Sequence, residues 1–419
     1  MPEPAAVPAG TSAAPAGQRS TPGSIFGRFL RFGFLAWGGP VAQIAMLRHE
    51  LVDQERWVTS ERFNRLLAVY QVLPGPEAHE LAVHLGLVRG GRLGAFLAGL
   101  GFMLPGFVLM VVLSWLYLRI DLTQATIAAA LLGAQIAVVA LVARAVPRIG
   151  SHILVDGWTW AIAIVAGLAT LVGVTFWIVL PLAAATYALA PRRGDRRRSA
   201  IPAAGVLAVL ILLSVFAAFA LAGTPTTGPA TEASGPASSP DAIALFGSGL
   251  KAGLLTFGGA YTAIPFVRHD AVGSGWLSDG QFLDGLALSG ILPAPLIIFA
   301  TFVGFVAGGL PGAVAITLGI FLPAFSFALL LGDRLEALVD WAPLHRALEG
   351  VAAGVVGIIT VTALQLGAAV AGRLPSLALG TVVFAGCLAV LLAWRSRWAT
   401  PAVVAGGALA GLVLLRGVS

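Results

Sequence analysis

Charged residues are scarce in this chain. Only 11% of its 419 residues are charged, whereas 58% are hydrophobic and the mean hydropathy is +0.92. A soluble domain has about 25% charged residues, so this composition excludes a surface that faces mainly water. Apolar stretches of about 18 or more residues recur, each long enough for a helix across a bilayer core of about 30 Å. The alternating pattern of membrane strands is missing. We therefore expect an all-α, polytopic helical membrane protein with about 10–13 membrane segments.

Cysteine, lysine and cofactor motifs are also scarce. Cys387 is the only cysteine, which excludes a disulfide framework and a thiolate metal site. The sequence has no nucleotide, haem or flavin motif, and we expect no cofactor and no metal. Lys251 is the only lysine among 25 basic residues, which are scattered between apolar spans. The net charge of +6 is therefore attributed to membrane loops, and we expect no nucleic-acid partner.

Composition divides the chain into four regions. Residues 1–23 lack the apolar core of a signal peptide and are predicted to be a disordered tail. Residues 24–190 and 241–419 are predicted to form two related domains. Residues 191–240 hold the basic cluster PRRGDRRR, which we expect in the cytoplasm, then an apolar span at 201–222 and a polar loop without Lys or Arg on the outer face.

The second domain repeats motifs of the first in fixed order. The matches include WGG at 37–39 with FGG at 257–259, RHE at 48–50 with RHD at 268–270, and LPGP at 73–76 with LPAP at 292–295. Residues 19–198 contain 17 basic residues and residues 251–416 contain 8, so equivalent loops are expected on opposite sides of the membrane. The sequence therefore predicts two homologous halves, arranged as an inverted repeat with broken helices.

Paired glycines interrupt the first apolar segment of each half. Glycine and proline are unfavourable inside a helix, so we expect breaks at Gly38, Gly39 and Pro40, and again at Gly258 and Gly259. Secondary transporters use paired discontinuous helices to bind substrate, with the freed N–H groups directed at an anion. Close helix packing through small residues is the alternative explanation.

A second interruption in each half is the proline element. Pro74, Gly75 and Pro76 recur as Pro293, Ala294 and Pro295, deep in apolar sequence. Two prolines that are two residues apart force non-helical backbone. This element is predicted to be re-entrant or kinked and to line the substrate path, with an interfacial turn as the alternative.

Basic residues in matched positions are candidate counter-charges for an anion. Arg31 and Lys251 precede the glycine pairs, and Arg48 and Arg268 follow them. A guanidinium fork suits a tetrahedral oxyanion because it donates two parallel hydrogen bonds. Snorkelling of these side chains to lipid head groups is the alternative.

Four titratable residues follow the first proline element: Glu77, His79, Glu80 and His84. Ionisable residues within membrane segments are functional candidates, and these are predicted to exchange a coupling proton. A cluster at the membrane edge is the alternative. The pair His79 and His84 is not a zinc-protease motif, because the two histidines are five residues apart rather than four and fall on different helix faces.

Two signatures in this sequence resemble those of the chromate ion transporter family. The first is Gly38-Gly39-Pro40 with Arg48 and LLAVYQVLPGPEAHELAVHLG, and the second is LLTFGGAYTAIPFVRHDAV with GWLSDGQFLDGLALSGILPAPL. The resemblance covers both halves and is to the long, two-domain form. It implies functional roles for Gly38, Gly39, Pro40, Arg48, Pro74, Gly75, Pro76 and Glu77, and for Gly258, Gly259, Pro293, Ala294 and Pro295.

The resemblance implies a multi-pass protein of the bacterial cytoplasmic membrane that exports chromate, driven by the proton-motive force, and confers chromate resistance. The expected partners are chromate or a sulfate-like oxyanion, protons, the lipid bilayer and a second copy of the chain. Transport of sulfate, a channel and an intramembrane enzyme are the alternatives. For the enzyme, Ser289 is the nearest candidate nucleophile, and we expect no enzymatic activity.

Overall fold

The computed structural model describes residues 21–122, 124–191, 200–222, 240–332, 341–394 and 396–415. Most of the predicted tail, the arginines of the basic cluster and the polar loop at 223–239 lie outside these residues. Within the described ranges the chain forms helices and turns, without β-strands, and this confirms the expected all-α class.

The first half contains eight helical elements and a connecting helix among the described residues. They are α1 (Pro22–Leu35), α2 (Gly39–Leu47), the π-helix η1 (Arg48–Gln54), α3 (Ser60–Val72), α4 (Glu77–Tyr117), α5 (Ala125–Ile153), α6 (Gly157–Leu171), α7 (Phe176–Leu189) and the connecting helix α8 (Ile201–Ala222). The second half contains α9 (Ala242–Leu254), η2 (Ala260–Ala263), α10 (Ile264–Ala271), α11 (Asp279–Gly290), η3 (Leu296–Ile298), α12 (Phe299–Ser326), η4 (Phe327–Leu331), α14 (Ala342–Ala371), α15 (Leu377–Ala393) and α16 (Ala399–Leu414).

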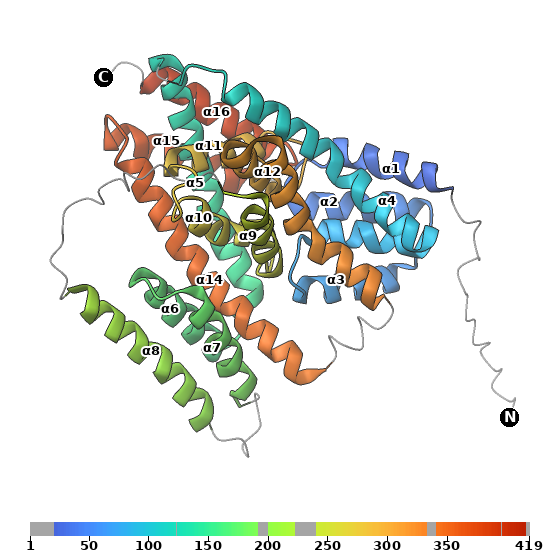
Figure 1. The fold of residues 1–419 in the computed structure, drawn as a ribbon, viewed down its shortest axis with the longest axis horizontal. Coiled ribbons are helices and arrows are strands. Elements are labelled where there is room, and N and C mark those ends of the chain that lie inside the picture. Colours follow the sequence, from blue (N-terminus) through green and yellow to red (C-terminus); the bar gives the residue numbers. More distant parts are fainter. Residues whose placement is uncertain are drawn as a thin grey trace, which may run out of the picture.

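Several of these helices have the length and composition of membrane spans. Five in the described ranges qualify, namely those at 77–117, 125–153, 201–218, 296–331 and 342–371, and five shorter helices are also apolar. Exposed Leu, Val, Ile, Phe and Trp side chains cover the outer faces, as expected in lipid. The chain is therefore a helical, multi-pass membrane protein. The connecting helix α8 lies at the edge of the molecule, beyond α6 and α7 (Figure 1).

Two of the long helices are hairpins rather than straight rods. In α4 the backbone leaves helical geometry at Gly90 (φ −134°) and Gly91 (φ +64°), and α12 does the same at Gly308 (φ −143°) and Gly309 (φ +62°). A straight helix of the 41 residues in α4 would measure about 60 Å, twice the apolar thickness of a bilayer. Because α4 folds back on itself at Gly90 and Gly91, each of its two arms is much shorter than this length.

The first arm of each hairpin is too short to cross a bilayer. Residues 77–89 span about 20 Å and residues 299–307 about 13 Å, against the roughly 30 Å that a crossing requires. Both arms follow the proline elements. This geometry agrees with the re-entrant form of these segments.

The two halves interlock. Helix α5 of the first half packs against α11, α14, α15 and α16 of the second, and α14 packs against α6 and α7. Figure 1 shows α14 running obliquely through the molecule beside these helices. Within each half, α1 packs along α4 and α9 packs along α12, which is the same pairing of a broken helix with a hairpin.

A buried polar cluster also joins the halves. The carboxylate of Asp284 on α11 accepts hydrogen bonds from Tyr117 of α4 (2.8 Å) and from the side-chain amide of Gln135 of α5 (2.7 Å). Arg373, which follows α14, donates to the other end of the Gln135 amide (2.9 Å). Because an unpaired buried carboxylate is costly, these partners fix α4 and α5 against the second half.

Glycine contacts set the spacing of α5 and α16. A methyl group added to Gly407 of α16 would lie 2.7 Å from Cβ of Ala137 and from the carbonyl oxygen of Gly133, both on α5. The neighbouring Gly406 has no atom within 4 Å of the same position. The Gly407→Ala substitution should therefore lower stability by about 1–3 kcal/mol through overpacking, measured by thermal unfolding of the purified protein in detergent.

The matched control is Gly406→Ala, which adds the same methyl group one residue away. It should leave the unfolding temperature unchanged or raise it slightly, since alanine favours helix. Equal effects of the two substitutions would contradict the close approach of α5 and α16.

Candidate functional site

A cavity of about 1220 Å³ lies between the two halves. We call it the shared cavity. Its wall includes residues 37–42 around the first glycine break, residues 257–259 at the second, the C-terminal part of α5 from Leu141 to Ile153, and residues 396–401 before and within α16. Both predicted helix breaks therefore face one space.

The first break separates α1 from α2. Gly38 (φ +90°) and Gly39 (φ +77°) have left-handed backbone, which only glycine adopts readily. Pro40 occupies the first turn of α2, where its missing N–H costs no hydrogen bond. The buried amide of Gln43 donates to the Ala36 carbonyl oxygen (2.9 Å) at the end of α1. The predicted helix break is thus present, and the N-terminus of α2 opens onto the shared cavity.

The second break also consists of two glycines with positive φ angles, but different side chains bond to its backbone. Gly258 (φ +73°) and Gly259 (φ +114°) separate α9 from η2 and α10. The Thr262 hydroxyl accepts from the Phe257 N–H (3.0 Å) and donates to the Gly259 carbonyl oxygen (2.8 Å). These bonds satisfy backbone groups that the break would otherwise leave unpaired.

The two breaks and the first proline element meet one another. A methyl group placed on Gly259 would lie 4.0 Å from Cγ of Pro40. The Gly75 N–H donates to the carbonyl oxygen of Thr256, just before the second break (2.8 Å). Backbone groups that are unpaired within one half are therefore satisfied by the other half.

The prolines of both proline elements lie beneath the cavity wall rather than on it. The buried residues are Pro74, Gly75, Pro76, Pro293 and Pro295. On the second-half side, Leu292, Ala294 and Leu296 line the shared cavity. Ala294 also packs against Gly106 of α4, leaving no room for a larger residue there. The proline elements thus shape the wall from behind.

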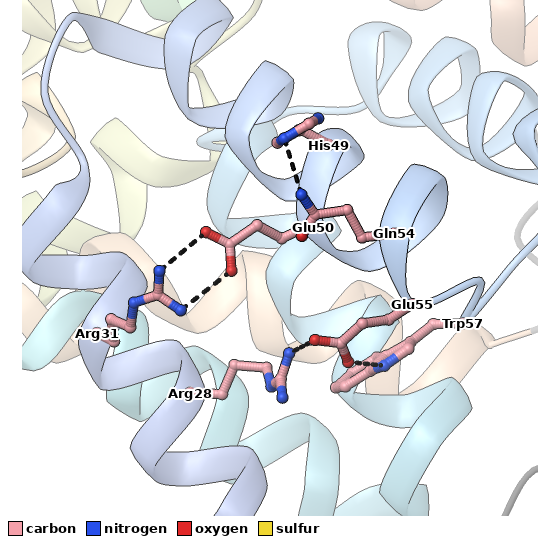
Figure 2. Close-up of polar contacts among 7 residues, drawn as sticks. All are labelled: Arg28, Arg31, His49, Glu50, Gln54, Glu55 and Trp57. Carbon is pink, nitrogen blue, oxygen red and sulfur yellow. Dashed lines mark hydrogen bonds and ion pairs between the residues drawn. The ribbon is translucent and has the colours of Figure 1, made fainter.

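The structure does not bring the matched basic residues to the shared cavity. Arg31 of α1 donates from both terminal nitrogens to Glu50 of η1 (3.3 and 3.4 Å), as Figure 2 shows. Lys251 of α9 forms the equivalent ion pair with Asp270 of α10. Each pair joins the helix before a break to the helix after it. The recurrence of these charges therefore has a structural explanation.

The second matched pair also has partners outside the cavity wall. Arg48 donates to the side chain of Asn64 (3.1 Å). Arg268 donates to Asp279 (2.8 Å) and to Gln365 (2.9 Å). Figure 2 shows a further ion pair of this kind, between Arg28 and Glu55, which also accepts from the Trp57 indole. These arginines connect helix ends.

Of the four titratable residues after the first proline element, Glu77 lines the shared cavity and the other three are buried behind it. Neither carboxyl oxygen of Glu80 has a hydrogen-bond partner among the described residues. His79 donates from Nε2 to the Gly99 carbonyl oxygen (3.1 Å), and its ring lies against Phe321 and Phe325 of α12. His84 Nδ1 is hydrogen-bonded to the Tyr70 hydroxyl (2.9 Å).

Three arginines that the sequence analysis did not single out line the shared cavity: Arg144, Arg148 and Arg397. Arg397 packs against Gly38, and the adjacent Trp398 packs on Trp37 with 4.9 Å between ring centroids. Arg144 and Arg148 lie inside the apolar helix α5. A pair of arginines four residues apart within an apolar run was the signal available in the sequence.

The fold and this site define a class. A multi-pass helical protein in which each half brings a broken helix to one cavity has the architecture of a secondary transporter. The chain belongs to the chromate transporter family, since the family's sequence model matches residues 23–189 and again residues 243–412. The double match is what two related halves would produce. Proteins of this family are transporters, not enzymes.

Two similar proteins cover nearly the whole chain, and a third covers about three quarters of it. A chromate transport protein of Pseudomonas aeruginosa is 59% identical over 389 residues, which is 92% of this chain and 91% of the relative. A chromate transport protein of Cupriavidus metallidurans is 30% identical over 394 residues, with 92% and 91% covered. An uncharacterised transporter of Methanocaldococcus jannaschii is 28% identical over 72% of this chain and 73% of its own. No solved structure matches the chain significantly.

The two equivalent ion pairs differ in burial, which predicts different effects on stability. The side chains of Lys251 and Asp270 are 14% and 17% exposed, whereas Arg31 is 62% exposed beside Glu50 at 17%. Lys251→Met should leave a largely buried carboxylate unpaired and lower stability by about 2–4 kcal/mol. Arg31→Met should cost less than about 1 kcal/mol, although Glu50 is as buried as Asp270, because solvent already screens the exposed Arg31 guanidinium. Thermal unfolding in detergent compares the two, and a larger effect at Arg31 would contradict the structural role.

Proposed function

We propose that this protein exports chromate, a dianionic oxyanion, from the cytoplasm across the cytoplasmic membrane and thereby confers chromate resistance. The observation that supports this most directly is that Gly38–Gly39 and Gly258–Gly259, from different halves, line one cavity. The wall therefore includes the N-terminal residues of α2, and the N-terminus of a helix favours an anion. Two relatives that align over most of their own length and of this chain are named chromate transport proteins, which supports chromate as the substrate.

The direction of transport follows from the charge of the substrate. Moving one elementary charge through 100 mV is worth about 2.3 kcal/mol, so a dianion gains about 4.6 kcal/mol on leaving an inside-negative cell. Because about 1.4 kcal/mol corresponds to a factor of ten, this potential sustains an outward gradient on the order of 1,000-fold. Export therefore needs no ATP hydrolysis.

The proposal assigns proton coupling to Glu77, with Glu80, His79 and His84 behind it. Glu77 lines the cavity that would hold the anion. A carboxylate and a dianion repel each other in a common cavity, so a protonated Glu77 favours the dianion and the dianion favours protonation, by linkage. Proton and substrate would then bind together. The complex with one proton keeps a net charge of −1, so the membrane potential still drives it outward, with about half the free energy available to the dianion alone.

Everted membrane vesicles test the function. When energised, vesicles that contain the protein should accumulate labelled chromate, and dissipating the membrane potential should abolish the accumulation. Vesicles from cells without the protein are the control. Uptake no greater than this control would refute export, and stronger inhibition by sulfate than by unlabelled chromate would make sulfate the preferred substrate.

The Glu77→Gln substitution tests the coupling. At pH values where chromate remains a dianion, acidification should lower the KM of the native protein, because protonation removes a negative charge from the shared cavity. The other charged or titratable groups near Glu77 are Arg144, Arg148, His152, Glu349 and Arg397 in the wall and Glu80 beneath it. In the Glu77→Gln variant the KM should be low at all these pH values. A variant that keeps the native pH dependence would assign the titration to another of these groups.

A further inference from the structure

Helix α5 places two arginines on the wall of the shared cavity. Arg144 and Arg148 are four residues apart, so they lie one turn apart on the same face of the helix. Both line the cavity, together with Pro147 between them. The surrounding helix is strongly apolar and has the length of a membrane span.

Neither guanidinium makes a hydrogen bond or an ion pair with any residue in the described ranges. In this they differ from Arg31, Lys251 and Arg268, each of which is paired with a carboxylate. A charge within the membrane costs several kcal/mol and is found where it pairs or lines a substrate path. Two such charges without protein partners, side by side on a cavity wall, are well placed to attract an anion.

We propose that Arg144 and Arg148 together bind the transported oxyanion. This assignment rests on the proposed function. Two guanidinium groups supply two positive charges and parallel hydrogen-bond donors, which match the charge and the several oxygens of a tetrahedral dianion. Both arginines also lie close enough to Tyr261, just after the second break, to interact with its hydroxyl electrostatically. The anion would therefore sit between α5 and the second break.

The contacts of the second break hold it beside these arginines. A methyl group placed on Gly258 would lie 3.2 Å from Ile149 and 3.3 Å from Ile153, so the glycine backbone packs directly on α5. Ile149 is the residue after Arg148. Substrate held by the arginine pair would thus be adjacent to the backbone of the second break.

The second half has no equivalent pair. Aligning Gly133 and Gly150 of α5 with Gly350 and Gly367 of α14 places Val361 opposite Arg144 and Gln365 opposite Arg148. Gln365 instead accepts a hydrogen bond from Arg268. The second half contributes Arg397 to the wall, but the adjacent arginine pair comes from the first half only. Each chain would therefore hold one dianion at this pair rather than two.

Glu77 acts against this binding. It lies near enough to Arg148 for the two charges to interact, although they form no direct ion pair. An arriving dianion would compete with the Glu77 carboxylate for Arg148. Neutralising Glu77 and neutralising Arg148 should therefore have opposite effects on the apparent affinity.

Reconstituted proteoliposomes test the assignment with Arg144→Ala and Arg148→Ala. Each substitution should raise the KM for chromate about tenfold or more, since a hydrogen bond to a charged group is worth about 1.5–3 kcal/mol. Arg→Lys at the same positions should have an intermediate effect, because charge remains while the planar fork is lost. The control is Arg119→Ala, an exposed arginine at the end of α4 that lies outside the cavity wall and should leave KM unchanged.

Thermal unfolding in detergent provides a readout that does not require transport. Chromate or sulfate should raise the unfolding temperature of the native protein, because a ligand that binds the folded state stabilises it, and the shift should be lost in both alanine variants. Without anion, these variants should be as stable as the native protein or more so, since an unpaired charge has been removed. Should an alanine variant fail to fold, the lysine and glutamine variants at the same position decide.

The outcomes separate this inference from the function it rests on. Native protein that transports chromate, with alanine variants whose KM and anion-induced shift are unchanged, would overturn the arginine assignment alone. If the native protein transports no chromate, the proposed function is overturned. The anion site is retained in that case if sulfate raises the unfolding temperature of the native protein but not that of the alanine variants.

Discussion

The structure depends on how two broken helices satisfy their backbone in an apolar solvent. A backbone N–H or C=O without a partner costs several kcal/mol in lipid, so breaks are tolerated only against protein or a wet cavity. Here each half provides partners or packing for the irregular backbone of the other. The Gly75 N–H of the first proline element pairs with the Thr256 carbonyl oxygen before the second break, and Gly259 lies against Pro40. The cavity is the consequence, because it exists where two irregular segments meet and neither is covered by a continuous helix.

Much of this architecture could be predicted from the sequence. Low charge, long apolar runs and the glycine pairs predict a helical membrane protein with broken helices, and the structure confirms both features. The physical reason is that glycine and proline act locally. The dihedral angles at Gly38, Gly39, Gly258 and Gly259 follow from the lack of a side chain, whatever the rest of the fold does. The opposite orientation of the two halves, by contrast, stays a prediction from the distribution of basic residues.

The charges of the site were harder to predict, because an arginine's role depends on what surrounds it in space. Arg31 and Lys251 were predicted to bind an anion because they occupy matched positions, yet the structure pairs each with an acidic residue across its own helix break. Two of the arginines on the cavity wall, Arg144 and Arg148, have no basic counterparts in the other half. Recurrence identifies what both halves need in order to fold. A binding group that only one half supplies does not recur in the sequence, so its position at the cavity is known only from the three-dimensional structure.

The size of the shared cavity has a consequence for how an ion would pass through it. A volume of about 1220 Å³ exceeds that of a single tetrahedral oxyanion many times over and has room for tens of water molecules. An ion held between α5 and the second break would exchange part of its hydration shell for protein groups and keep water on the side of the open cavity. Discrimination between ions of equal charge and similar shape would then depend on that partial exchange rather than on a close steric fit, so chromate and sulfate should differ more in how fast they are released than in whether they are admitted.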